Sequence, residues 1–273
     1  MVVRDLKDGS SIVSTQEDHA ELSAQFAAHW GNKDFAKLRP YESMVFATTY
    51  HDSGYREWEG NPPVNTEKGR PYGHRETIPS FEKFELEAYV RNVEWVRAHD
   101  PYAGLLVSMH RTGLWQNRYQ TFTSPKGRLR ERSPEVQAVK KELEARQEEE
   151  KKSLGKTDLK FDGQLWFNYR TLQLYDFLSL YFCCDGYAGD NHLKEDAVAP
   201  VPVAYDSKEE VELRIVPTSA NSVQIFPYPF DISPLKVSVR ARVIPAGTFA
   251  SAAECTEAYH KAPRQLLTFE ITG

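Results

Sequence analysis

The stretch spanning residues 161–184 constrains the fold most, because it is apolar on nearly every face of the helix that it predicts. A helix without a polar face is buried, so this segment is expected to run through the core. One acid, Asp176, lies inside it, and an unpaired carboxylate among leucines and aromatics is costly to bury. The sequence therefore predicts a cation beside Asp176, either a metal ion or an arginine such as Arg170.

Hydrophobic periodicity divides the rest of the chain into a leading hairpin, a helical body and a β-prone tail. A Lys-Asp-Gly-Ser turn at residues 7–10 predicts a short ribbon over residues 2–14. Helices are expected over residues 15–31, 41–51, 79–98, 101–115 and 135–153. The first should be capped by Thr15, with Asp18 three residues on. A long ordered loop is expected over residues 55–78, where glycine, proline, asparagine and charge dominate.

The tail, from about residue 198, carries β-prone runs separated by prolines. These runs cover residues 211–216, 223–226, 235–244 and 266–271, and the third alternates clearly between apolar and polar side chains. We therefore expect a mainly α protein: a helical domain over residues 1–196 that includes the ribbon, and a β-rich antiparallel extension over residues 197–273. The extension is open to three roles, which are covering an active site, forming a homodimer interface or adding rigidity.

The net charge and the distribution of apolar residues limit the kinds of partner that we expect the protein to bind. The 34 basic and 39 acidic residues give a net charge of -5, so no global positive field favours nucleic acid or an anionic membrane. The opening residues lack the apolar core of a signal peptide, and the densest apolar stretch is too short to span a bilayer. We expect a cytoplasmic protein without membrane or nucleic-acid partners. The three cysteines form no disulfide framework, and we interpret them as buried thiols.

Histidines and acids in the helical body form a candidate metal site. His19 lies in the first predicted helix, the His51-Asp52 pair ends the second, and His110 lies inside another. Neutral imidazoles and carboxylates suit divalent transition metals such as Fe, Mn, Zn, Ni or Co. With Asp176, these residues predict a site for one or two such ions.

The order of these residues resembles a known signature. His19, then His51-Asp52, then a distant Asp176 resembles the H…HD…D pattern of the HD-domain superfamily of metal-dependent phosphohydrolases. Residues 16–20, 51–58 and 105–114 are also similar to an uncharacterised bacterial family related to these proteins. The resemblance covers residues 12–184 and does not extend to the tail.

The resemblance implies an HD-like helical bundle in which His19, His51, Asp52 and Asp176 ligate one metal. It also implies that Asp52 bridges to a second metal, helped by His110. In such a site metal-activated water attacks a phosphate ester or a related small anionic substrate. The residues expected to act in catalysis are Asp52, His110 and Tyr55, and Tyr55 stands where many members carry lysine.

Besides Tyr55 in place of lysine, the histidines depart from the family pattern. No histidine lies between His110 and Asp176, so a fifth ligand would be His74, His99 or His29, or be absent. For the substrate, cationic and aromatic side chains near the motif are the candidates. We expect Arg56, Trp58 and Arg111 to contact it, with Arg70 and Arg75 as further candidates.

Two other functions fit the same residues. An HD-type diiron oxygenase would use redox-active iron in place of Lewis-acid chemistry. A non-catalytic ligand-binding protein would keep the histidines and acids only as a hydrogen-bonded core. A metal-dependent hydrolase acting on a small anionic substrate is the reading we prefer.

Overall fold

The computed structural model describes residues 1–76, 81–115, 133–155, 163–187, 191–247, 249 and 251–273. The main helices are α1 (Gln16–Ala28), α2 (Tyr41–Tyr50), α3 (Arg56–Gly60), α4 (Phe81–His99), α5 (Pro101–Trp115), α6 (Pro134–Ser153), α7 (Gly163–Leu180) and α8 (Ala252–Lys261). A 3₁₀ turn, η1 (Ser53–Tyr55), precedes α3, and a π turn, η3 (Tyr181–Asp185), continues α7. The strands are β1 (Val2–Asp5), β2 (Ser11–Ser14), β3 (Val64–Asn65), β4 (Arg70–Pro71), β5 (Asp196–Pro202), β6 (Glu210–Pro217), β7 (Ser222–Phe226), β8 (Leu235–Ile244) and β9 (Arg264–Thr272).

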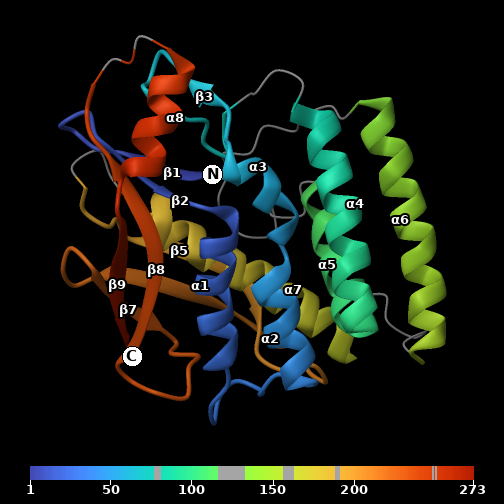
Figure 1. The fold of residues 1–273 in the computed structure, drawn as a ribbon. Helices are drawn as coiled ribbons and strands as arrows, with labels where there is room; N and C mark the ends of the chain where they lie inside the picture. Colours follow the sequence, from blue (N-terminus) through green and yellow to red (C-terminus); the bar gives the residue numbers. More distant parts are fainter. Residues whose placement is uncertain (77–80, 116–132, 156–162, 188–190, 248, 250) are drawn as a thin grey trace.

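Seven of the strands form one curled sheet in the order β1-β2-β8-β9-β7-β6-β5. The leading ribbon joins this sheet because β2 pairs with β8, with Val13 opposite Arg242. All neighbours are antiparallel except β7 and β9, which run parallel with Val223 opposite Ile271. The sheet is therefore mixed, and it unites segments from both ends of the chain (Figure 1).

The helices pack against this sheet and then against each other. Helix α1 contacts β8 on one side and α2 and α7 on the other. Helix α5 in turn contacts α2, α4, α6 and α7, and α6 lies at the edge of the molecule farthest from the sheet (Figure 1). The space enclosed by α1, α2, α5 and α7 is thus surrounded by secondary structure on all sides.

Helix α1 begins as its sequence predicts. The Thr15 hydroxyl accepts a hydrogen bond from the backbone N–H of Asp18, and the Asp18 carboxylate accepts from the backbone of Thr15, so a capping box is formed. Leu22 and Phe26 turn inward with His19, because residues three, four and seven apart share one face of a helix. The apolar face of α1 therefore carries a histidine into the interior.

Helix α7 occupies the core, as its all-round apolar pattern predicts. Nearly every residue from Leu165 to Ser179 is buried, including Asp176. Beyond it, Phe182 in η3 contacts Phe26 of α1 and Phe269 of β9, with ring centroids 5.9 Å and 4.9 Å apart. These contacts hold α7 between α1 and the sheet.

The prediction of a mainly α fold with a separate antiparallel extension is wrong. Among the described residues about 49% are helical and 23% are in strands, and the seven-stranded sheet is mixed. Periodicity shows that residues 2–14 are β-prone, but it carries no information about which distant strand they pair with. The ribbon and the tail form one sheet because the edge of β2 that faces away from β1 pairs with the edge of β8 that faces away from β9.

Two further segments differ from their expected structures. The expected loop over residues 55–78 begins at the last residue of η1 and contains α3 and the small β3–β4 hairpin within its described part. Residues 252–261 form helix α8 in the tail, where only strands were expected. Ser251 caps this helix by accepting from the Glu254 backbone N–H, a short local signal that the surrounding β-prone runs obscured.

Within the described part of the chain, no helix combines the length and the apolarity needed to cross a bilayer. Cys183, Cys184 and Cys255 are free thiols; Cys183 and Cys255 are buried and Cys184 is partly buried. The prediction of buried thiols is thus confirmed for Cys183 and Cys255, whereas Cys184 is only partly buried.

Candidate metal centre

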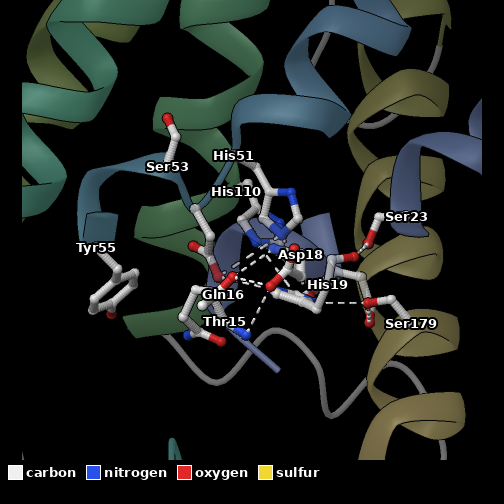
Figure 2. Close-up of polar contacts among 12 residues, drawn as sticks. Thr15, Gln16, Asp18, His19, Ser23, His51, Ser53, Tyr55, His110 and Ser179 are labelled. Carbon is white, nitrogen blue, oxygen red and sulfur yellow. Dashed lines mark hydrogen bonds and ion pairs between the residues drawn. The ribbon is translucent and has the colours of Figure 1, made fainter. Parts of the chain in front are cut away.

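Five histidine and aspartate side chains from four different elements meet at the centre of the helical layer. They are His19 of α1, His51 and Asp52 at the end of α2, His110 of α5 and Asp176 of α7. Each is less than 9% exposed. Figure 2 shows the labelled imidazole rings of His19, His51 and His110 converging on one point between these helices.

The distances within this cluster are those of a potential ligand set. The Nε2 atom of His19 lies 3.1 Å from Asp52 Oδ2, and Nε2 of His51 lies 3.6 Å from Asp176 Oδ1. His110 Nε2 is 3.7 Å from Asp176 Oδ2. One donor atom from each of His19, His51 and Asp176 lies within 4.8 Å of the other two, close enough to share an ion.

A backbone carbonyl fixes the orientation of His51. Its Nδ1 lies 2.7 Å from the Thr48 carbonyl oxygen, which can only accept, so Nδ1 carries the proton. The bare Nε2 then faces Asp176 and, at 3.9 Å, Asp52. This atom is inaccessible to solvent and has no hydrogen-bond partner among the described residues. A lone pair that faces two carboxylates requires a cation or an added proton between them.

A serine hydroxyl fixes His19 in the same way. Ser179 donates its hydroxyl proton to the Asp176 carbonyl oxygen, so its oxygen is left to accept from His19 Nδ1 at 2.8 Å. The Nε2 atom of His19 therefore turns its lone pair toward Asp52. Histidines that bind metals in proteins are held by such hydrogen bonds at the second ring nitrogen.

The electrostatics of the cluster favour extra positive charge. Burial alone would raise the pKa of Asp52, but His51, His19 and a hydrogen bond from Tyr89 hold it well below its usual range. Asp176 is held low by its histidine neighbours despite the same burial. Burial opposes charge on His51, yet the two carboxylates raise its pKa to about 9. Burial dominates at His110 and lowers its pKa to about 4.

Helix α4 supports the His51-Asp52 turn from outside the cluster. Asn92 donates to the carbonyl oxygens of Tyr50 and His51, each at 2.9 Å, and accepts from Ser53 at 2.6 Å. Gly54 allows this close approach, because a Cβ there would overlap the Ala88 carbonyl oxygen. The glycine of the His-Asp-Ser-Gly segment therefore has a packing role.

Tyr89 of α4 completes the support of Asp52. Its hydroxyl donates to Asp52 Oδ1 at 2.6 Å, which leaves Oδ2 directed at His19. The Arg111 guanidinium stacks on the Tyr89 ring and pairs with Glu85. A buried cation thus lies against the ring of the tyrosine that binds Asp52.

The remaining residues expected at the site lie around the cluster. Tyr55 is buried to one side of it, with its hydroxyl 3.3 Å from Glu85 Oε1 and its ring against Tyr89 (Figure 2). Arg56 is solvent-exposed and pairs with Glu17, and Trp58 stacks on Phe84. The structure thus brings all five expected metal ligands together and places the expected substrate contacts outside them.

Arg170, the alternative cation expected beside Asp176, does not pair with it in the structure. Arg170 pairs with Glu210 and donates to the Pro200 carbonyl oxygen, both on the sheet side of α7. The two residues are six positions apart on α7, more than one and a half turns, so they point to different sides of the helix. Asp176 is therefore surrounded by histidines.

The three histidines considered as a fifth ligand, His29, His74 and His99, lie apart from the five-residue cluster. His29 pairs with Asp231 at the surface, and His99 Nδ1, also at the surface, donates to the Trp95 carbonyl oxygen. His74 is partly buried, and one of its ring nitrogens lies within 4.8 Å of donor atoms of Cys184 and Asp185, in a second grouping. None of the three is part of the five-residue cluster formed by the described residues.

Sequence reasoning missed the residues that orient the ligands. Ser179 lies three residues after Asp176 on α7, and this spacing on one helix face was the available signal. Tyr89 and Asn92 lie three residues apart on α4, but nothing local links them to residues 50–53. Their roles arise from packing between α4 and the turn after α2.

Comparisons with known proteins place the chain in a family without assigning an activity. No curated protein and no solved structure gives a match to it. One family model, described as "Protein of unknown function (DUF3891)", matches residues 1–246. Because this match covers most of the 273 residues, the chain belongs to the DUF3891 family of proteins of unknown function.

Proposed function

We propose that this protein is a metal-dependent hydrolase of phosphate esters or related small anionic substrates. The ligands of one or two divalent transition-metal ions would be His19, His51, Asp52, His110 and Asp176. The observation that carries the proposal is the buried Nε2 atom of His51, which faces two carboxylates and has no hydrogen-bond partner among the described residues. This arrangement is unfavourable for a neutral imidazole in an ordinary core, and either a proton on Nε2 or a metal ion satisfies it. The convergence of two more histidines on the same carboxylates favours the metal ion.

The donor set indicates which metals fit. Three imidazole nitrogens and two carboxylates suit Fe, Mn, Zn, Ni or Co better than Ca²⁺ or Mg²⁺, which prefer oxygen ligands. When bound, such an ion supplies Lewis-acid polarisation of a phosphoryl oxygen and activation of water. The resemblance to HD-domain phosphohydrolases, which rests on the same residues, supports this chemistry.

The protein side chains have distinct roles in this proposal. Thr48 and Ser179 hold His51 and His19 in the tautomer that presents Nε2 to the site. Tyr89 fixes Asp52 through Oδ1 and leaves Oδ2 for binding. His110 contacts the cluster from the α5 side through Nε2, where it can bind a second ion or stabilise negative charge that develops on the substrate.

The test begins with elemental analysis of the full chain purified without chelator. We expect about one or two equivalents of transition metal per chain, in the range that such ligand sets hold, and metal-dependent hydrolysis of a chromogenic phosphate ester. His51→Ala should lose both, whereas His99→Ala, at a surface histidine, should lose neither. A His51→Ala protein that keeps its metal and its activity would contradict the proposal. Substrate-dependent O₂ consumption without phosphate-ester hydrolysis would replace it with oxygenase chemistry.

A further inference from the structure

A second polar pocket lies apart from the histidine cluster. A cavity of about 310 Å³ is bounded by β1, by residues 68–76 around β4, and by η3 with Tyr187 after it. Cys184 and Asp185, which line it, follow Asp176 by eight and nine residues along α7 and η3. At about 1.5 Å per residue, the backbone of Cys184 lies at most about 12 Å along the helix from that of Asp176. The charges of the cluster still act on the pocket, because His19 contributes to the lowered pKa of His74 and Asp176 to the raised pKa of Arg75.

Most charges in this pocket are paired with each other. Arg70 binds Asp5 and Glu76, and Arg75 pairs with Asp185. Lys68 also forms an ion pair with Glu76, in addition to the one from Arg70. The three carboxylates that line the pocket are therefore each neutralised by a neighbouring cation. Arg4, which also lines the pocket, has no ion pair within the described part of the chain.

Arg4 is a cation with unsatisfied donors. Its Nε and Nη1 atoms are inaccessible to solvent and lack hydrogen-bond partners among the described residues. Its guanidinium carbon lies 3.5 Å from the centre of the Tyr187 ring, and Tyr187 also forms a side-chain hydrogen bond with Arg4. The two remaining buried donor atoms, Nε and Nη1, are costly without an acceptor, and an anionic ligand would supply one.

His74 offers a further donor in the same pocket. Its Nε2 atom is inaccessible to solvent and also has no hydrogen-bond partner in the described residues. Its backbone N–H donates to the Met1 carbonyl oxygen at 2.8 Å, which fixes this stretch of chain against the start of β1. Burial lowers the pKa of His74 to about 4, so the ring is neutral at pH 7 and can still donate one N–H to an anion.

The grouping of His74 with Cys184 and Asp185 also resembles a cation site, but its charges oppose one. The Asp185 carboxylate is already held by Arg75. Burial raises the pKa of the Cys184 thiol well above its usual value, so the sulfur stays protonated and donates to the Leu180 carbonyl oxygen at 3.4 Å. With Arg4 and Arg75 beside it, the pocket is a better environment for negative charge than for a second metal ion.

We propose that this pocket binds the phosphate group of a small ligand through Arg4 and His74, with Arg75 at its rim. The pocket is lined by residues outside the histidine cluster, and binding does not require the metal. The cavity is larger than a phosphate ion, so the ligand would be a phosphorylated small molecule, for which inorganic phosphate is the simplest probe.

The experiment is titration calorimetry of the chelator-treated full chain with inorganic phosphate. We expect saturable binding at one site, weakened about 10-fold or more in Arg4→Gln, because a charge-assisted hydrogen bond is lost. Arg214→Gln, at an exposed β6 arginine paired with Glu195, should bind as the wild type does. Acetate and chloride should bind much more weakly than phosphate.

Two further variants keep the proposal open to contradiction. Arg75 is 58% exposed, so Arg75→Gln should fold even if Arg4→Gln does not, and it should also weaken phosphate binding. His51→Ala should leave phosphate binding unchanged, which separates this proposal from the proposed metal centre. Absence of saturable binding in the millimolar range would overturn the proposal. So would binding that needs added Zn²⁺ and is lost in Cys184→Ser.

Discussion

His51 Nδ1 lies 2.7 Å from the carbonyl oxygen of Thr48, one turn earlier in its own helix. The helix end thus satisfies one of its last carbonyl groups and, at the same time, selects the tautomer of the histidine that follows it. Because the acceptor belongs to the backbone, the orientation of His51 does not depend on any other side chain. The orientation of His19 depends on a hydroxyl group, which can be removed.

Ser179→Ala removes the acceptor for His19 Nδ1. We expect metal affinity to fall by about 10- to 100-fold, the range for loss of a hydrogen bond to a metal-binding histidine. The matched control is Ser23→Ala, because Ser23 is buried one turn after His19 and donates to its backbone carbonyl oxygen, away from the imidazole ring. Metal competition titrations of the two variants measure the difference, and equal affinities would show that Ser179 does not orient the ligand.

Tyr89→Phe removes the hydrogen bond to Asp52 Oδ1 and keeps the ring that packs under Arg111. We expect phosphate-ester turnover to fall by about 10-fold or more, since a charged hydrogen bond contributes about 1.5–3 kcal/mol. Tyr55→Phe serves as the comparison, because its hydroxyl is directed to Glu85. A larger loss of turnover in Tyr55→Phe than in Tyr89→Phe would instead favour the catalytic role that the sequence suggested for Tyr55.

Gly54→Ala should destabilise the protein, because the new Cβ would overlap the Ala88 carbonyl oxygen and lie 2.9 Å from Asn92 Cβ. Overpacking of this kind costs about 1–3 kcal/mol in the free energy of unfolding. Gly60→Ala is the control, since a Cβ there meets no described atom within 4 Å. Urea unfolding of both variants tests this, and a Gly54→Ala protein as stable as Gly60→Ala would refute the close approach of α4.

The ion pairs around Arg70 predict a loss of stability in acid. Partial burial would raise the pKa of Glu76, but Arg70, Lys68 and the Gly73 N–H lower it to about 2. Since this lies below the value of 4.5 for an unperturbed glutamate, the carboxylate contributes stability above pH 4.5. That contribution disappears as the pH falls from 4.5 toward 2.

Glu76→Gln should make the free energy of unfolding depend less on pH as the pH falls from 4.5 toward 2. The group is partly exposed, so we expect the screened contribution to be about 1 kcal/mol. The control is Glu257→Gln, at an acid on the surface of α8 that pairs with Lys261. Urea midpoints measured between pH 5 and pH 2.5 provide the comparison. A wild-type profile as flat as that of Glu76→Gln would exclude the predicted contribution.

The sequence predicted those features whose signals are local. The Thr15–Asp18 cap, the helices at residues 41–50 and 101–115, and the buried helix that carries Asp176 all follow from spacing within a few turns. The convergence of the five candidate ligands also agrees with the motif, because three lie on inward-facing helix positions and the other two in the turn that ends α2. Their role as ligands stays a prediction.

Features that depend on contacts between residues far apart in the sequence could not be predicted from local patterns. Pairing of β2 with β8 joins residues more than 200 positions apart, and the parallel pair of β7 and β9 requires the crossover through β8 and α8. The hydrogen bond from Tyr89 to Asp52 and the phosphate pocket around Arg4 likewise depend on which elements pack together. Periodicity reports which face of an element is apolar, and it does not identify what covers that face.

The packing of α1 on β8 has a consequence for the order in which the protein matures. Gln25 exchanges two hydrogen bonds with the backbone of Ser238, and Arg240 binds Asp18 at the start of the same helix. All five candidate ligands precede residue 177, so a ribosome finishes them well before it makes β8. The hydrogen bonds that hold the His19 helix against the sheet form only after that strand is made, whereas its contacts with α2 and α7 do not depend on it. Under the proposed function, the candidate ligands are therefore expected to reach their final rigidity late, after synthesis of the sheet.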